Sequence, residues 1–271
     1  MIPYPNISPV IVSLGPLQLR WYGTMYLLGF LVGYWFLKRL TARWATGFRG
    51  DLILDFLAYA ALGIVVGGRL GYVLIYNLPY YLQHPLEVFA VWHGGLSFHG
   101  GFVGVALAGW WFVRRHGLRL YEVADPVVIP LPIALGLGRI GNFINGELFG
   151  RPTEVPWCMV FPQGGPVCRH PSQLYEAFLE GLVLFLCMWL LGRTPRPPGL
   201  VFWGFVGLYG ICRFLVEFTR GPDPQLGLIL GPLSMGQVLS LPMVILGAWM
   251  VWRKSQNSEA RIQKSRGRTN R

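Results

Sequence analysis

The chain has 271 residues, of which only 13% are charged and 15% are aromatic, and its mean hydropathy is +0.46. This composition is typical of a membrane protein and excludes an ordinary soluble domain. A formal net charge of +11 also suggests nucleic-acid binding, but seven of the 23 basic residues lie in residues 253–271. We therefore interpret the basic charge as a disordered cytoplasmic tail attracted to anionic lipid headgroups, with no nucleic-acid partner.

A helix needs about 20 mostly apolar residues to cross the hydrocarbon core of a bilayer. Runs of this kind predict an all-α integral membrane protein with about seven transmembrane helices in a single polytopic domain, residues 1–252. The spans are expected at about residues 21–37, 52–76, 88–113, 124–145, 173–192, 199–217 and 226–252. The second, fourth and fifth spans are the weaker predictions, because they contain ionisable side chains.

The distribution of basic residues predicts the orientation of these spans. With the C-terminus in the cytoplasm, 16 Lys and Arg residues lie in cytoplasmic segments, four lie outside and three lie within spans. The positive-inside rule then places the N-terminus outside, with residues 1–19 as a small interfacial or periplasmic element and residues 150–171 as an outer loop. Cys158 and Cys168 flank that loop. In an oxidising compartment they form a disulfide or stay free, and the sequence leaves both open.

Ionisable side chains inside spans are costly unless they are paired or hydrated, so each is a candidate functional residue. The alternative is that they form internal ion pairs that only hold helices together. Tyr209, Arg213 and Glu217 are four residues apart and therefore share one face of a helix. We expect Glu217 to hold Arg213 in position for an anionic ligand.

Residues 138–150 combine an arginine, two amides and a carboxylate with four glycines. Arg139 offers a planar fork suited to phosphate oxygens, and glycines let the backbone approach a ligand. Asn142, Asn145 and Glu147 are the other polar residues of this stretch. Residues 136–141 also match a dinucleotide-binding fingerprint, but no soluble strand precedes them, so we discount that match.

A second polar cluster, residues 93–101, contains His93 and His99 between pairs of glycines. Taken alone, such a histidine is more often a structural hydrogen-bonding group. The glycines and the phosphate-type cluster elsewhere favour His99 as a general base. The histidines lack zinc-ligand spacing, and Ser97 and Ser172 lack a nucleophile motif, so we predict no metal, no cofactor and no serine nucleophile.

Four stretches together carry a family resemblance: GRIGNFINGELFGRPT, GGLSFHGG, RHPSQLYE and YGICRFLVEFTRGPD. They resemble the bacterial prolipoprotein diacylglyceryl transferase family, in the same order, from about residue 21 to residue 237. The resemblance implies transfer of the sn-1,2-diacylglyceryl group of phosphatidylglycerol to the lipobox cysteine thiol in the signal peptide of a prolipoprotein. It further implies a multi-pass enzyme of the bacterial plasma (inner) membrane, whose active site opens towards the outer leaflet or periplasm.

Under this resemblance we expect His99 to be the base and Arg139 and Arg213 to clamp the phosphate in one shared cavity. The remaining expected site residues bind the lipid or orient those that do. Asn142, Tyr209, Tyr22, Gly150 and Arg69 are expected to contact phosphatidylglycerol, with Glu147, Glu217, Asn145 and Glu176 as orienting residues around them.

Two other functions fit arginines and carboxylates at membrane depth. A phospholipid transporter or flippase holds such groups around broken helices, although no inverted halves are visible here. A structural scaffold would make Arg139→Ala and His99→Ala silent. None of the four cysteines needs to react in the transferase, because there the nucleophile belongs to the substrate.

Overall fold

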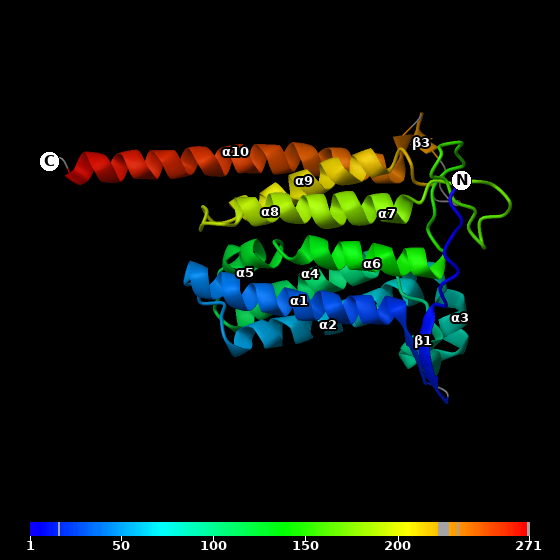
Figure 1. Cartoon of the computed structure of the whole chain (residues 1–271). Helices are drawn as coiled ribbons and strands as arrows, with labels where there is room; N and C mark the ends of the chain where they lie inside the picture. Colours follow the sequence, from blue (N-terminus) through cyan, green and yellow to red (C-terminus); the bar gives the residue numbers. More distant parts are fainter. Residues whose placement is uncertain (16, 222–227, 232, 270–271) are drawn as a thin grey trace. The chain divides into compact units, whose positions relative to one another are not determined.

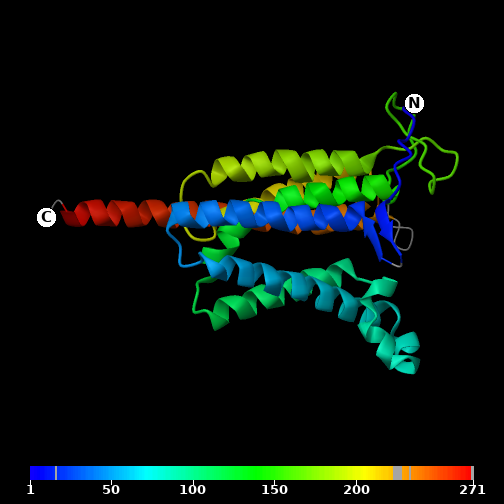
Figure 2. The same ribbon diagram turned by 60° about the horizontal axis from the view of Figure 1, so that its bottom comes forward.

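The computed structural model describes residues 1–15, 17–221, 228–231 and 233–269. The chain divides into two compact units, each described by itself below. The first unit comprises Met1–Leu37 and Ala124–Arg271, and the second comprises Lys38–Val123. Both units are mostly helical (Figures 1 and 2).

The first unit starts with an antiparallel hairpin, β1 (Val10–Leu14) and β2 (Leu17–Arg20), in which Val10 pairs with Arg20 and Leu14 with Leu17. Helix α1 (Trp21–Trp44) follows, and its last turns belong to the second unit. Helix α5 (Leu120–Val127) begins in the second unit and ends in the first. The remaining elements of the first unit are α6 (Leu131–Asn145), α7 (Ser172–Glu176), a π-helical stretch η4 (Ala177–Val183), α8 (Leu184–Leu191), α9 (Leu200–Val216), strands β3 (Leu228–Leu230) and β4 (Leu233–Ser234), and α10 (Met235–Thr269).

Local sequence explains where two of these helices begin and end. Pro132 lies in the first turn of α6, where its missing N–H costs nothing, and Gly146 ends the helix with a left-handed φ of 68°. The start of helix α9 is capped by Asp125, a buried residue of α5. Its carboxylate accepts hydrogen bonds from the backbone N–H groups of Gly199 (2.6 Å) and Phe202 (2.8 Å), which have no partner within the helix. In Figure 1, α9 runs along α10.

The second unit is built on α2 (Asp51–Gly71) and α4 (Phe98–Arg115), which lie side by side in Figure 2. The turns between them are η1 (Tyr72–Tyr76), α3 (Leu78–Gln83), η2 (Pro85–Phe89) and η3 (Val91–His93). Glycines allow the helix backbones to touch. A Cβ atom added at Gly67 would lie 2.6 Å from Gly104 Cα, and one at Gly71 would lie 2.7 Å from Gly100 Cα.

Three helical segments of the described chain are long and apolar enough to cross a membrane: Asp51–Tyr76, Ser172–Leu191 and Met235–Asn257. A fourth candidate is the pair α5 and α6, which is bent by 47° at the break between them. Large apolar side chains on these helices point outward, including Leu62 and Ile245, each 65% exposed. The chain is therefore an all-α membrane protein with three to four candidate spans.

The structure differs from the predicted spans and tail at three places. The span expected at 88–113 becomes a helix only at Phe98, because Gly94 and Gly95 have φ of 85° and 75° and Ser97 caps the helix. The last span, expected from 226, begins at Met235 after the β3–β4 hairpin; residues 226–227 and 232 lie outside the described residues. Helix α10 continues through residues 253–269, where we expected a disordered tail, because no proline interrupts it there; residues 270–271 lie outside the described residues.

Candidate active site

A network of three arginines and three glutamates lies inside the first unit. Its members come from four elements: Arg139 from α6, Glu176 from α7, Glu180 from η4, and Arg213 from α9, with Glu217 and Arg220 just after the end of α9. Glu176 and Glu180 are almost completely buried, with 0% and 1% of their side chains exposed. Carboxylates buried this deeply require close positive partners.

Arg139 and Arg213 meet on the same two carboxylates. Arg139 Nε lies 2.9 Å from Glu176 Oε2, and its Nη2 lies 3.8 Å from Glu180 Oε2. Arg213 Nη1 donates to Glu176 Oε2 at 3.2 Å and to Glu180 Oε1 at 3.3 Å. The two arginines that we expected to share a cavity therefore converge.

Glu217 orients Arg213, as its spacing in the sequence predicts. Its Oε1 accepts a hydrogen bond from Arg213 Nη2, and its Oε2 accepts one from Ser234 Oγ at 2.7 Å. Gly236, at the start of α10, lies so close to the Glu217 carboxylate that no side chain fits there. The carboxylate thus joins the end of α9 to the start of α10.

Sequence reasoning missed Arg220 and gave Glu180 no role. Arg220 Nη1 lies 4.0 Å from Glu176 Oε2 and 3.8 Å from Glu217 Oε1. Burial, followed by the positive charge of Arg213, lowers the pKa of Arg220. The sequence held a signal for Glu180, which follows Glu176 by four residues. Helical spacing held none for Arg220, which lies beyond the end of α9.

We expected Glu147 to orient an arginine, and this prediction was wrong. Its Oε1 accepts hydrogen bonds from the side-chain amides of Asn142 (2.9 Å) and Asn145 (3.1 Å). The left-handed turn at Gly146 ends α6 and lets the carboxylate fold back onto the helix. Gln173 Nε2 supports the same turn by donating to the backbone oxygen of Glu147 at 2.7 Å. Glu147 therefore fixes the two amides of the signature stretch.

Position 150 requires glycine because its backbone packs closely against other parts of the protein, not against a ligand. Gly150 forms an isolated antiparallel bridge with Arg220, and its N–H donates to His170 O at 2.9 Å. A Cβ atom at this position would lie 2.7 Å from His170 Cβ and also collide with Thr219 O. The glycine therefore fixes the backbone that carries Arg220.

The two expected tyrosines lie in the same unit. Tyr22 packs on Gly141 of α6, where an added Cβ atom would lie 3.0 Å from the Tyr22 ring, and its hydroxyl is 3.1 Å from that of Tyr26. Tyr209 lies on α9, one turn before Arg213, and stacks on Phe205 with ring centroids 5.8 Å apart.

His99 is the second residue of α4 and is exposed. Ser97 caps this helix: its Oγ accepts from Gly100 N at 3.2 Å, and its own N–H donates to Gly68 O at 2.9 Å. The start of α4 is thereby tied to the end of α2, with the imidazole held on a fixed helical turn. The side chain of His93 lies outside the described residues.

Arg69 occupies a different environment from the one we expected. It is only 4% exposed, and its guanidinium donates five hydrogen bonds to backbone carbonyls of the segment 87–95. The acceptors are Val88 O (2.8 Å), Gly94 O (2.6 Å), Gly95 O (3.2 Å), Glu87 O (2.5 Å) and Ala90 O (3.2 Å). A guanidinium has five N–H groups, so none remains for a lipid. Arg69 shapes the segment that precedes α4 instead of contacting phosphatidylglycerol.

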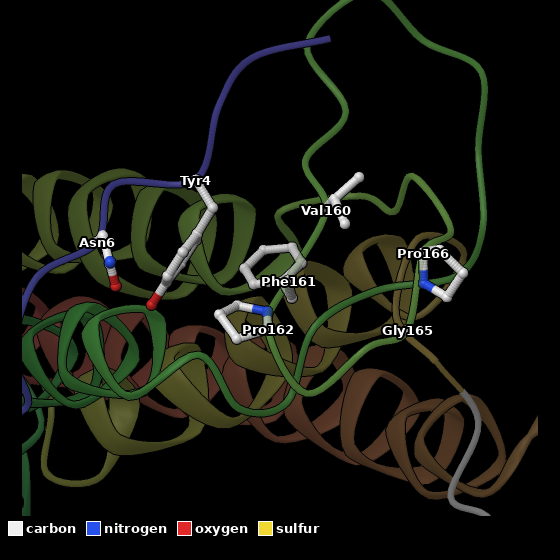
Figure 3. A pocket seen from close by; sticks show the side chains of 7 residues that line it. All are labelled: Tyr4, Asn6, Val160, Phe161, Pro162, Gly165 and Pro166. Carbon is white, nitrogen blue, oxygen red and sulfur yellow. The ribbon is translucent and has the colours of Figure 1, made fainter.

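The loop after α6 contains the disulfide that the sequence left open. Cys158 and Cys168 are bonded, with 5.5 Å between their Cα atoms. This loop and the N-terminal stretch form an open pocket of about 620 Å³ (Figure 3). It is lined by Tyr4, Asn6, Val160, Phe161, Pro162, Gly165 and Pro166, none of which is an expected site residue. Within the described chain, no three His, Cys, Asp or Glu side chains group as metal ligands.

Comparison with known proteins identifies the class of this chain. The sequence profile of the family described as prolipoprotein diacylglyceryl transferase matches residues 9–253. The chain therefore belongs to this family of membrane transferases.

Three curated relatives are similar to this chain over nearly its whole length. Each is a phosphatidylglycerol–prolipoprotein diacylglyceryl transferase. The protein of Geobacter sulfurreducens is 55% identical over 247 residues, which cover 91% of this chain and 95% of its own. That of Nitratidesulfovibrio vulgaris is 53% identical, with 93% and 96% covered, and that of Vibrio cholerae is 53% identical, with 92% of each chain covered.

Proposed function

We propose that this chain transfers the sn-1,2-diacylglyceryl group of phosphatidylglycerol to the lipobox cysteine of a prolipoprotein. The products are a thioether-linked lipoprotein precursor and glycerol phosphate. The observation that carries the proposal is the convergence of Arg139, Arg213 and Arg220 on buried carboxylates in a membrane protein of this family. The names of the relatives supply the two substrates.

The reaction needs a nucleophile and a stabilised leaving group. The cysteine sulfur attacks the glyceryl carbon that carries the phosphate, a C–S bond forms, and the C–O bond breaks with its electron pair passing to the phosphate oxygen. A phosphodiester with one negative charge thus becomes a monoester with more charge. Guanidinium groups fixed before the reaction favour that change, because they need no reorganisation as the charge develops.

The thiol must lose its proton before it attacks, since its ordinary pKa is about 8.5. We assign the proton acceptor to His99, because an imidazole can take up a proton and this residue is exposed on the capped first turn of α4. Asn142 and Tyr209 are assigned to hydrogen bonds with the headgroup, and Tyr22 to the lipid contact beside Gly141.

We further propose seven spans in a bacterial plasma membrane, with the N-terminus outside, the C-terminus cytoplasmic and the site open to the outer leaflet. The charge asymmetry of the connecting segments supports this topology. The disulfide of the 150–171 loop supports an oxidising outer location. Maleimide labelling of single cysteines introduced at Ser8 and at Ser255 in intact cells tests it: only the first should react with an impermeant reagent.

The central experiment combines purified protein, phosphatidylglycerol and a lipobox peptide. Mass spectrometry should find the peptide heavier by one diacylglyceryl group, together with free glycerol phosphate. A peptide with serine in place of the lipobox cysteine is the matched control and should remain unmodified. Lipid movement between leaflets of a vesicle without thioether formation would instead identify a flippase.

A further inference from the structure

The three arginines of the network differ in how many of their N–H groups are occupied. The guanidinium of Arg213 donates hydrogen bonds to Glu176, Glu180 and Glu217, so three carboxylates surround it. Those of Arg139 and Arg220 donate no hydrogen bond to any atom of the described residues, although both lie near Glu176 Oε2, at 2.9 and 4.0 Å. Their side chains are also 21% and 16% exposed.

Apart from the ion pair of Arg139 Nε with Glu176, the N–H donors of these two guanidiniums are left for a ligand. They are also accessible, because no arginine nitrogen is among the fully buried atoms that lack a partner in the described residues. The lowered pKa of Arg220 points the same way, because burial and Arg213 leave its positive charge incompletely compensated. An anion placed between Arg139 and Arg220 would use these donors and this charge.

We infer that Arg220 and Arg139 form the phosphate clamp, and that Arg213 is the residue that holds the carboxylates together. This inference rests on the proposed function and reassigns the clamp that the sequence placed on Arg139 and Arg213. The two guanidiniums flank one carboxylate oxygen, so they can each take one non-bridging oxygen of a lipid phosphodiester.

The backbone of Arg220 is fixed as a binding residue requires. Its N–H donates to Val216 O at 3.2 Å, and its carbonyl accepts from Arg151 Nε at 2.7 Å. Arg151 also donates from its backbone N–H to Thr219 O at 2.9 Å, next to the bridge between Gly150 and Arg220. Gly150 is therefore a positioning residue for Arg220.

The test compares glutamine variants of the three arginines, since glutamine keeps polarity and removes the charge. Binding of sn-glycerol 1-phosphate is measured by calorimetry in detergent, transfer is measured as kcat/KM for phosphatidylglycerol, and folding is measured by thermal unfolding. For Arg220→Gln we expect both affinity and kcat/KM to fall about 10- to 150-fold, the loss for a charge-assisted hydrogen bond, with wild-type unfolding. For Arg213→Gln we expect a lowered unfolding temperature.

Arg20→Gln is the matched control, because Arg20 is exposed and, among the residues that the structure describes, its guanidinium donates only to Gln18. Arg220→Lys serves if the glutamine variant does not fold: it keeps the charge beside Glu176 and Glu217 but loses the planar fork, so affinity should still fall. Wild-type affinity and kcat/KM in a folded Arg220 variant would overturn the clamp. Absence of thioether formation by wild-type protein that still binds glycerol phosphate through Arg220 would overturn the proposed function alone.

Discussion

Arg69 is buried and Arg213 is partly buried, and both lie on apolar helices, but they have opposite kinds of partner. The guanidinium of Arg69 contacts five neutral backbone carbonyls of one connecting segment, whereas that of Arg213 contacts three carboxylates from separate elements. Arg69 therefore fixes the path of the chain, and Arg213 assembles a charged site. An arginine in an apolar helix is therefore not by itself evidence of a ligand site. Its hydrogen-bond partners, and the N–H groups that have no partner, must also be known.

The largest expected effect on transfer comes from His99, on helix α4, which follows the segment that Arg69 shapes. His99→Gln removes the proposed proton acceptor, so kcat should fall about 10²- to 10⁴-fold while the KM for phosphatidylglycerol stays unchanged. Initial rates at varied lipid concentration measure both constants. His84→Gln, at an exposed histidine of the same unit, should retain wild-type rates. Wild-type kcat in the His99 variant would show that the proton goes elsewhere.

Next in size is Arg139→Lys, which keeps the positive charge but replaces the planar fork by a single ammonium group. Activity should fall about 10- to 150-fold, because one charge-assisted hydrogen bond to phosphate is lost. The same variant should bind sn-glycerol 1-phosphate more weakly, which calorimetry measures. Full turnover by the lysine variant would remove Arg139 from the clamp and leave it an ion-pair residue.

A change at Arg69 should affect folding more than chemistry. Arg69→Met keeps much of the side-chain length but removes the donor to five carbonyls. Glu87 O would keep its bond from Ala90 N, and each buried carbonyl left without a partner costs about 1–3 kcal/mol. We expect a marked drop in unfolding temperature, with the affinity for glycerol phosphate unchanged in protein that remains folded. Arg114→Met, at an exposed arginine packed over Trp110, is the control. If the Arg69 variant were fully stable but bound glycerol phosphate weakly, Arg69 would be a ligand residue after all.

The smallest effect on transfer is expected at the loop disulfide. Replacing Cys158 and Cys168 together by serine should lower the stability of the protein by about 2–4 kcal/mol, through loss of the cross-link. Transfer per folded molecule should not change, because the reacting thiol belongs to the substrate. Thermal unfolding and peptide modification measure the two properties separately. Complete loss of transfer in a folded, inserted double variant would contradict this division.

Part of the site could be predicted from sequence and part could not. Helical spacing correctly paired Glu217 with Arg213, because residues four apart lie next to each other on one face of a helix. Arg139 and Arg213 were expected together because the family resemblance implies a departing phosphate, whose growing negative charge needs cationic partners. The partners of Arg69 were invisible, since any residue can supply a backbone carbonyl.

The other wrong predictions all concern residues at turns or at the ends of helices. Hydropathy does not show that Gly94 and Gly95 have positive φ values, which separate the preceding turns from α4. It also does not show that Gly146 turns Glu147 back onto Asn142 and Asn145. Arg220 was missed because it follows the end of α9, where the apolar pattern has already stopped.

The glycine contacts between α2 and α4 have a consequence for how the enzyme moves. Gly67 and Gly71 meet Gly100 and Gly104 with no side chain between them, and the cap at Ser97 bonds to Gly68. Neither helix can slide along the other without pressing main chain into main chain. Any movement of α4 that displaces His99 during turnover is therefore expected to carry α2 with it.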